Sequence, residues 1–288
     1  MNALWSLYHP AVPPFLRKLA DTPPMARLRQ VGMNCGCEYT AFPEFSSWLP
    51  YSRFDHSLGV ALIVWHFTGD IRQSAAGLLH DVATPVFAHV VDFLHDDHLR
   101  QESTEGRTAE LIARSPELQA LLEGYGLTTE DVADCHRYPV ADNDSPQLSA
   151  DRLEYTLGDL RCYGFAGEDA IRAFYEDLTV WRDEAGRPEL AFRTLETACA
   201  FTKASLQTAR IYVADEDRFT MQMLADLLRL ALDRGVLVQA DLWRTEPAVI
   251  GKLEADSVCR PLWQRFRSLC RVERRPGRPD RRIWLPVP

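Results

Sequence analysis

The sequence predicts a mainly α-helical protein with one small β-hairpin. Most of the chain reads as successive apolar or amphipathic stretches of helical length. The strongest is RFTMQMLADLLRLALDRG, residues 218–235, whose apolar residues return at helical spacing and which ends at Gly235, a residue favoured after helix C-termini. The single clear strand signal is LTVWRDEAGRPELAF, residues 178–192, where two runs of strand-forming residues flank Asp-Glu-Ala-Gly.

The N-terminal half contains a series of predicted helices. Residues 57–68, SLGVALIVWHFT, form an apolar run in which Gly59 is the one weak breaker. A second helix is expected over 72–81, because Thr84-Pro85 follows and proline cannot continue a helix. A third helix is expected to begin within 87–94. Residues 105–123 are expected to form one helix, or two divided at Pro116. A helix start is expected at 128–131, and two more helices are expected over 148–160 and 168–177.

After the hairpin, the sequence predicts a long helical stretch from about 193 to 234. The tail RVERRPGRPDRRIWLPVP, residues 271–288, is basic and rich in proline. We expect it to be a poorly packed terminus or a strand that pairs with a partner.

The charge balance argues against a broad nucleic-acid or membrane surface. The 288 residues include 32 Lys and Arg against 41 Asp and Glu, a net charge of −9. A local basic pocket could still hold a phosphate. We expect no signal peptide, because no basic region followed by a long apolar stretch is evident at the N-terminus, and the longest apolar run, around 60–67, is too short to span a bilayer.

The seven cysteines are odd in number and mostly scattered, which indicates buried thiols in a reducing cytoplasm rather than a disulfide framework. Cys35-Gly-Cys37 is the one close pair. Without a second such pair we interpret it as structural, with a metal or redox role as the alternative.

A His-Asp pair lies in the apolar stretch AGLLHDVATPVFAHVVDF, residues 76–93. Burying His80 and Asp81 without partners would be costly, and a metal ion beside them would remove that cost. The chain offers two further ligands, His56 in RFDHSLGVA and Asp151 in DRLEYTLGD. The alternatives are a backbone-bonded His56 and a helix N-cap at Asp151, a role that Ser149 could also fill.

The order of these residues resembles the HD superfamily of metal-dependent phosphohydrolases. RFDHSLGVA, GLLHDVATPVFAHVVD and DRLEYTLGD resemble three motifs of its dGTPase-like, dNTP triphosphohydrolase branch, and ARLRQVG resembles an upstream segment. The resemblance is strong over about 25–165 and thin to about 237. It implies an HD-domain helical bundle over 1–165 and, over 166–288, a helical extension that holds the hairpin and the basic tail.

The resemblance implies that His56, His80, Asp81 and Asp151 bind one divalent metal. Two imidazoles and two carboxylates suit Mn, Fe, Ni, Zn, Co or Mg. Such an ion activates water for attack on phosphorus. The implied reaction is hydrolysis of a phosphate ester or anhydride on a small molecule, expected to be a nucleotide: a dNTP or a nucleoside monophosphate.

The same resemblance assigns substrate contacts. Arg53 and Arg152 correspond to phosphate-binding positions, and Tyr155 and Asp159 to positions that contact phosphate or sugar. A surface ion pair is the alternative role for Arg53, and an ordinary solvated helix face is the alternative for the other three.

The catalytic residues implied are His89, at the scissile phosphate, Asp92 and Glu105. A satisfied core histidine is the alternative for His89. Thr84 and Thr104 replace two histidines of the branch. The proton donor for the leaving group is therefore missing from its expected place, and His98, Glu102, Glu105 or His136 could substitute.

Two other functions stay open. Extra histidines (His89, His95, His98 and His136), together with the ligand-rich loop HRYPVADND, 136–144, leave room for a second metal. A dinuclear phosphodiesterase or oxygenase would then show two metals per chain and redox-active iron. A regulatory nucleotide-binding protein would bind nucleotide without turnover. A cytoplasmic location is expected, and a homo-oligomer is left open.

Overall fold

The computed structural model describes residues 4–46, 48–94 and 107–273 and confirms the mainly α-helical class. Over these residues it has sixteen α-helices and one two-stranded antiparallel sheet. The chain divides into two compact units, a first unit of residues 1–29, 51–83 and 105–208 and a second of 30–50, 84–104 and 209–288. This division differs from the boundary near residue 165 expected from the sequence, which stays a prediction for the extent of the family core.

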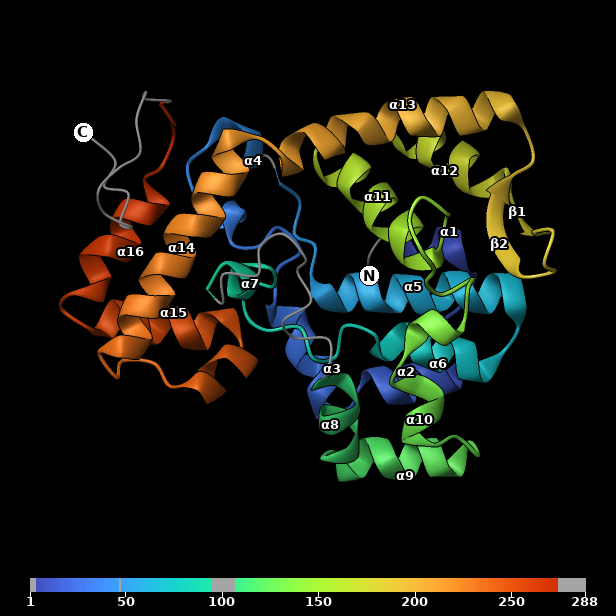
Figure 1. Cartoon of the computed structure of the whole chain (residues 1–288), viewed down its shortest axis with the longest axis horizontal. Helices are drawn as coiled ribbons and strands as arrows, with labels where there is room; N and C mark the ends of the chain where they lie inside the picture. The colour runs from blue at the N-terminus through green and yellow to red at the C-terminus, as the bar shows by residue number, and fades with distance from the viewer. Residues whose placement is uncertain (1–3, 47, 95–106, 274–288) are drawn as a thin grey trace. The chain divides into compact units, whose positions relative to one another are not determined.

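The first unit holds the larger group of helices and the hairpin (Figure 1). Its elements are α1 (Trp5–Tyr8), α2 (Pro14–Ala20), α3 (Pro23–Arg27), α5 (Arg53–Thr68), α6 (Ile71–Leu79), α8 (Thr108–Ala113), α9 (Pro116–Gly124), α10 (Thr129–Val132), η4 (Cys135–Arg137), α11 (Ala150–Cys162), α12 (Glu168–Glu176), β1 (Leu178–Arg182), β2 (Pro188–Phe192) and most of α13 (Leu195–Tyr212).

Helix α5 is the buried axis of the first unit and packs against both α6 and α11. It begins at Arg53, four residues earlier than predicted, because Ser52 and Asp55 form a reciprocal capping box. It ends at Gly69, whose φ of 62° suits a glycine C-cap. Side chains on all sides of the helix are buried, in line with its nearly continuous apolar sequence.

Helix α6 ends at Leu79, so His80 and Asp81 lie just beyond it and not inside a helix reaching residue 81. The His80 ring accounts for part of this ending, since its Nδ1 donates to the Gly77 carbonyl at 2.8 Å. A carbonyl of the last turn is thereby satisfied by a side chain.

Local capping sets the other helix boundaries in this unit. The stretch 105–123 contains two helices divided at Pro116, which is one of the two predicted alternatives. Ser115 caps the second helix. Thr128 and Asp131 form a capping box on the short α10. Ser149 caps α11, so Asp151 is not the capping residue and its carboxylate is left for other contacts.

The hairpin is present where the sequence predicts it. Strands β1 and β2 are antiparallel, with Leu178 opposite Phe192 and Val180 opposite Leu190. In the connecting loop, the Asp183 carboxylate accepts hydrogen bonds from the backbone of Ala185 and Arg187.

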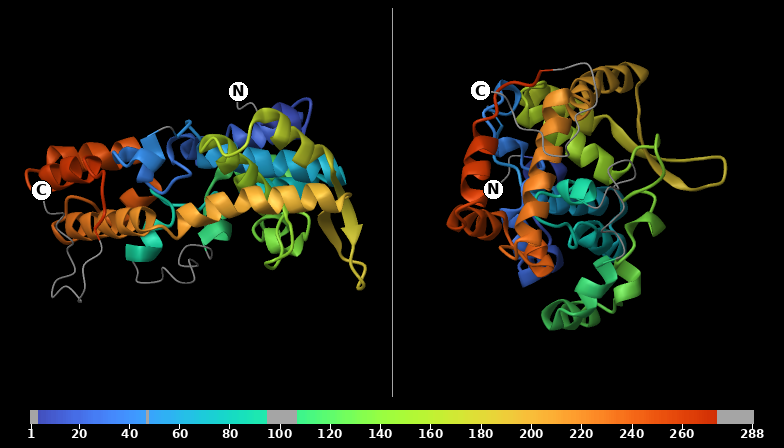
Figure 2. Two further views of the ribbon diagram at one scale, coloured as in Figure 1. Left: turned by 90° about the horizontal axis from the view of Figure 1, so that it is seen from above. Right: turned by 60° about the vertical axis from the view of Figure 1, so that its left-hand side comes forward.

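The second unit is also helical, and its helices α14, α15 and α16 pack together, as the orange and red ribbons of Figure 2 show. Its elements are η2 (Cys37–Tyr39), α4 (Pro43–Ser46), α7 (Val90–Leu94), α14 (Asp215–Asp233), η5 (Gln239–Trp243), α15 (Glu246–Ala255) and α16 (Cys259–Arg267), while η1 (Leu28–Gln30) lies at the unit boundary.

Two predictions in this part need correction. The helix expected from residue 87 begins at Val90, because Phe87 and Ala88 have φ angles of 57° and 46°, outside the helical region. The helical stretch 193–234 divides into α13 and α14 at residues 213–214. Gly235 follows α14 with a φ of 70°, as expected for a C-terminal glycine. The tail from residue 274 lies outside the described residues.

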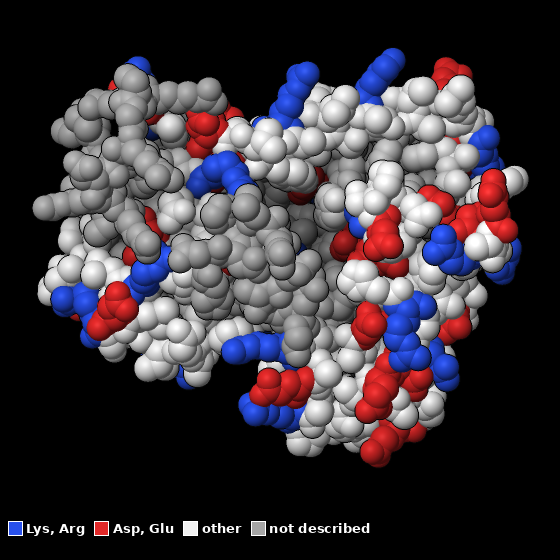
Figure 3. Space-filling view, in the orientation of Figure 1, with Lys and Arg blue, Asp and Glu red and all other residues white. Residues whose placement is uncertain are grey.

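None of the helices in the described part of the chain combines the length and apolar character that a membrane span requires. All seven cysteines are free, as expected, but only three of them are buried (Cys37, Cys162 and Cys259). Cys35 and Cys135 are half-buried, and Cys199 and Cys270 are exposed, so the expectation of buried thiols is wrong for these four. On the coloured part of the face in Figure 3, basic and acidic side chains are interspersed.

Two glycines allow α5 and α11 to approach closely. A Cβ on Gly59 of α5 would lie 2.4 Å from Glu154 Oε1, and a Cβ on Gly158 of α11 would lie 2.5 Å from the Tyr51 hydroxyl. Real Cβ atoms essentially never come so close to another atom. The absence of a side chain at these positions therefore leaves room for the buried Glu154 and Tyr51.

We expect Gly59→Ala to destabilise the protein. Helix propensity alone would favour alanine by up to about 1 kcal/mol. The clash with Glu154 opposes this, since overpacking a core typically costs about 1–3 kcal/mol. Urea unfolding measures the difference. Gly251→Ala is the matched control, because Gly251 is also inside a helix and has nothing within 4 Å of its added Cβ. Equal stabilities for the two variants would contradict the packing argument.

Candidate metal centre

The first unit brings together four of the side chains singled out in the sequence. The Nε2 atoms of His56 and His80 are 3.2 Å apart. Asp151 Oδ1 lies 2.9 Å from the first and 3.4 Å from the second. Asp81 Oδ2 lies 3.9 Å from His56 Nε2 and 3.7 Å from His80 Nε2.

Three segments far apart in sequence supply these side chains. His56 is in the first turn of α5, His80 and Asp81 follow the last turn of α6, and Asp151 is in the first turn of α11. The packing of α6 and α11 against α5 brings these helix ends together. Helix ends suit this task because their caps fix the direction of the chain.

Each histidine has its other ring nitrogen occupied by an acceptor. His56 Nδ1 donates to Glu154 Oε2 at 2.7 Å. His80 Nδ1 donates to the Gly77 carbonyl at 2.8 Å. Because carboxylate and carbonyl oxygens only accept, both Nδ1 atoms carry a proton, so Nε2 is the atom through which each neutral ring can bind a metal ion.

Glu154 is a site residue that sequence reasoning missed. It is fully buried and accepts hydrogen bonds from His56 and from the Tyr51 hydroxyl. Tyr8 is buried near the same carboxylate, and burial together with the charge of Glu154 raises the pKa of its hydroxyl. The available signal was the spacing, since Glu154 lies three residues after Asp151 and therefore near the same face of α11.

The donor set fits a divalent ion. Two ligands held about 2.1 Å from one ion at angles of about 90–110° lie roughly 3.0–3.4 Å apart. The separations among the His56, His80 and Asp151 atoms fall close to this range, while Asp81 would need a small movement. Two carboxylates would balance the charge of a divalent ion, and the imidazole and carboxylate ligands suit a borderline metal.

Without an ion, protons would neutralise part of this cluster. Burial lowers the pKa of His56, but hydrogen bonds to Asp151 and Glu154 outweigh it and raise the pKa to about 10. The pKa of His80 is also raised, because Asp81 and Asp151 outweigh its burial. Burial opposes ionisation of Asp151, but the hydrogen bonds from the two histidines hold its pKa well below the usual value.

Two arginines lie beside Asp81. Arg53 is buried and its Nη1 is 3.0 Å from Asp81 Oδ2. Arg53 is the first residue of α5, about one turn before His56, and its phosphate contact stays a prediction. Arg27, in the segment ARLRQVG, is half-buried, donates to the Val82 carbonyl at 3.1 Å and interacts electrostatically with Asp81. Burial lowers the pKa of Arg27 to about 10, so it stays charged at neutral pH.

Arg152 points toward the loop that precedes α11. Its guanidinium bonds to the carbonyl oxygens of Asn143 and Gln147 and to the Asn143 side chain. In this arrangement the side chain holds the loop in place, and phosphate binding by Arg152 stays a prediction. The sugar contacts expected of Tyr155, which is half-buried, and of Asp159, which is buried, stay predictions as well.

Of the three expected catalytic residues, two lie in the second unit and one lies outside the described residues. His89 and Asp92 lie in the second unit, where His89 Nδ1 is 3.1 Å from the buried Asp92 Oδ2. The His89 side chain is 41% exposed, which leaves its ring accessible. Glu105, with His95, His98, Glu102 and Thr104, lies outside the described residues.

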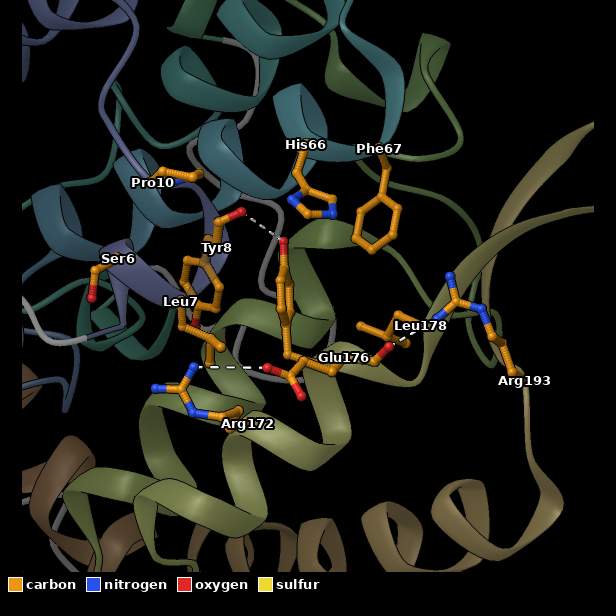
Figure 4. Close-up of a pocket in the computed structure, with 11 residues that line it drawn as sticks. Ser6, Leu7, Tyr8, Pro10, His66, Phe67, Arg172, Glu176, Leu178 and Arg193 are labelled. Carbon is orange, nitrogen blue, oxygen red and sulfur yellow. Dashed lines mark hydrogen bonds and ion pairs between the residues drawn. The ribbon is translucent and has the colours of Figure 1, made fainter.

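A pocket of about 330 Å³ lies elsewhere in the first unit (Figure 4). Its wall includes Tyr8, His66, Phe67 and Tyr175, and the Tyr175 hydroxyl donates to the Tyr8 carbonyl at 3.0 Å. His66 is ten residues after His56 on α5, about 15 Å along the helix at 1.5 Å per residue. The pocket is therefore separate from the histidine cluster.

Comparison with known proteins supports a metal-dependent phosphohydrolase family. The chain is 28% identical over 242 residues to the uncharacterized protein YdhJ of Bacillus subtilis, a match that covers 83% of this chain and 71% of that protein. It is 30% identical over 142 residues to the metal-dependent phosphohydrolase cns2 of Cordyceps militaris, which covers 46% of this chain and 39% of the relative. It is 28% identical over 144 residues to the deoxynucleoside triphosphate triphosphohydrolase SAMHD1 of Gallus gallus, with 43% and 23% covered.

The chain thus matches less than half of either relative with a named activity. No protein-family model matches it. The names of these two relatives support a metal-dependent phosphohydrolase at partial coverage, and the dGTPase-like branch stays a prediction.

We expect Glu154→Gln to weaken metal binding by about 10–100-fold, the usual effect of losing the carboxylate behind a metal-binding histidine. Calorimetric titration of chelator-treated protein with Mn²⁺ measures the affinity. Glu168→Gln, at the exposed start of α12, is the matched control and should bind like the wild type. An unchanged affinity in Glu154→Gln would show that this carboxylate does not orient a ligand.

Metal binding should also release protons. The folded-state pKa of His56 is raised to about 10, so metal-free protein holds this proton at pH 7 and loses it only as the pH rises through about 10. A metal needs the neutral ring, so we expect at least about one proton released per ion at pH 7 and progressively less toward pH 10 and above. A pH indicator in weakly buffered solution gives the count. The absence of release at pH 7 would contradict the proposed ligand.

Proposed function

We propose that this protein is a metal-dependent phosphohydrolase acting on a nucleotide, with His56, His80, Asp81 and Asp151 as the metal ligands. The observation that carries the proposal is the arrangement of the two imidazoles. Each has its Nδ1 proton held by a buried acceptor, so both Nε2 atoms point at one place beside the Asp151 carboxylate. The names of two relatives, a metal-dependent phosphohydrolase and a deoxynucleoside triphosphate triphosphohydrolase, favour the same reaction class.

A divalent ion bound there would lower the pKa of a coordinated water toward about 7 and withdraw charge from a phosphoryl group. The protein's own part is to fix the ligands before the substrate arrives. Glu154 and the Gly77 carbonyl keep the histidine rings in one orientation, and Tyr51 holds Glu154. This preorganisation means that little rearrangement is needed at the moment of reaction.

Positive charge for the substrate phosphate comes, in this proposal, from Arg53 and Arg27. Both lie near Asp81, and both are partly or wholly withdrawn from water. An arginine matches the geometry of phosphate oxygens and keeps its charge at neutral pH. Since the chain carries a net charge of −9, a polyanionic substrate needs such a local concentration of positive charge.

The departures from the family pattern narrow the range of substrates that we expect. Thr84 and Thr104 stand where the dNTP triphosphohydrolase branch has histidines. We therefore expect a slow triphosphohydrolase or a nucleoside monophosphatase. His89, tied to Asp92, is the candidate group at the scissile phosphate, and Tyr155 and Asp159 are the candidate nucleoside contacts.

The test is turnover with Mn²⁺ on a panel of nucleoside mono-, di- and triphosphates, with phosphate, pyrophosphate and triphosphate release followed separately. Asp151→Asn should lower kcat/KM by at least about 100-fold, because metal activation of water and phosphoryl group is worth several kcal/mol and each 1.4 kcal/mol is a factor of ten. Asp169→Asn, on the exposed face of α12, is the matched control.

The product released identifies the bond that is cleaved. Full activity in Asp151→Asn, or no metal-stimulated release from any nucleotide by wild-type protein, would contradict the proposal. His89→Ala, compared with His9→Ala at a half-buried histidine outside the proposed site, tests the acid–base assignment, for which a loss of about 10²–10⁴ in kcat is expected.

A further inference from the structure

A second cluster of metal-binding side chains lies in the first unit, in the loop that connects α10 to α11. Ligand atoms of Cys135, His136 and Asp142 all lie within 4.8 Å of one another. Cys135 and His136 are in the short helical turn η4, and Asp142 follows six residues after His136. These residues are separate from the four ligands of the centre described above and form no part of the proposed hydrolysis.

The ring of His136 is held by carboxylates on both sides. Its Nδ1 lies 3.4 Å from Asp134 Oδ1, and its Nε2 lies 3.1 Å from Asp142 Oδ2. Asp134 is itself fixed, because its Oδ1 accepts a hydrogen bond from the His136 backbone at 3.1 Å. A carboxylate on one ring nitrogen, with a ligand group at the other, is the arrangement that orients metal-binding histidines.

The carboxylate of Asp142 is also oriented by its surroundings. Its Oδ1 accepts hydrogen bonds from the Ser149 hydroxyl at 3.2 Å and from the Asn143 backbone at 2.8 Å, and Arg152 Nη1 lies 3.5 Å from it. These groups all engage one oxygen. The other, Oδ2, is the oxygen that contacts His136 Nε2, whereas the ion pair with Arg152 is made by Oδ1.

We propose that Cys135 Sγ, His136 Nε2 and Asp142 Oδ2 form a second metal site, for a thiophilic divalent ion of the Zn²⁺ or Co²⁺ class. One thiolate and one carboxylate would balance the ion's charge, and three protein ligands leave a fourth position for water. The thiolate distinguishes this site from the first, whose ligands are all nitrogen and oxygen and which has no preference for a soft metal.

Such an ion would join two parts of one loop. Cys135 and His136 belong to the turn after α10, whereas Asp142 belongs to the segment that Arg152 and Ser149 hold against the start of α11. Asp151 is in that first turn of α11. The ion would therefore fix the loop that leads to the first metal centre, and His136 would act as a ligand and not as a substitute proton donor.

Cobalt absorption tests this site without reference to activity. Full-length, chelator-treated protein is titrated with Co²⁺, and the near-ultraviolet thiolate-to-cobalt charge-transfer band is followed together with bound metal per chain. We expect a saturating band in the wild type, its loss in Cys135→Ser, and at least about tenfold weaker cobalt binding at this site in His136→Ala. His136 is exposed, so its truncation removes a ligand without opening the core.

Two controls locate the band. Cys162→Ser removes a buried thiol elsewhere in the first unit, on α11, and should keep the band. Asp151→Asn weakens the first centre and should keep it too, so failure of this site and failure of the hydrolase proposal give different results. A wild type without the band, or a band of unchanged intensity in Cys135→Ser or in His136→Ala at limiting cobalt, would overturn the proposal.

Discussion

The hydrogen bond between His56 and Glu154 is the interaction on which the rest of the candidate centre depends. A fully buried carboxylate is costly unless it is paired. Here Glu154 is paired with a histidine from another helix and with Tyr51, so α11 is held to α5 at a fixed rotation. Gly59 and Gly158 leave the space that this polar pairing needs between two otherwise apolar surfaces. The same bond decides which nitrogen of His56 is left for a metal.

This arrangement explains how so many ionisable groups lie within an apolar unit. Burial by itself would disfavour charge on His56, His80 and Asp151, and their mutual contacts outweigh it. In the absence of an ion, the positive imidazolium groups and the negative carboxylates offset each other's cost of burial. A divalent ion would take over that role, and its binding is therefore linked to proton release.

The chain crosses between its two compact units several times. Two of the chain segments that form the first unit, 51–83 and 105–208, contain its metal-binding candidates, and the second unit contains the His89 and Asp92 pair. A boundary placed near residue 165 follows the family motifs, whereas the compact units follow the contacts of helices that return from later in the chain. The motif order and the packing of the helices therefore divide the chain at different residues.

Local sequence determined most of the helices and the hairpin, because capping residues, turn residues and apolar spacing act over a few residues. The four candidate ligands were predicted from the order of the motifs, which resembles the HD superfamily. Sequence patterns placed helix boundaries less accurately where the boundary depends on the surrounding structure. Helix α6 ends before His80, and α7 begins after two residues of positive φ. Tertiary structure alone decided the partner of Glu154, the commitment of Arg152 to its loop, the place of Arg27 beside Asp81, and the grouping of Cys135 with Asp142. His56 and Glu154 are 98 residues apart, and no local pattern records that pairing. The burial that makes it strong arises only when α5 and α11 pack together.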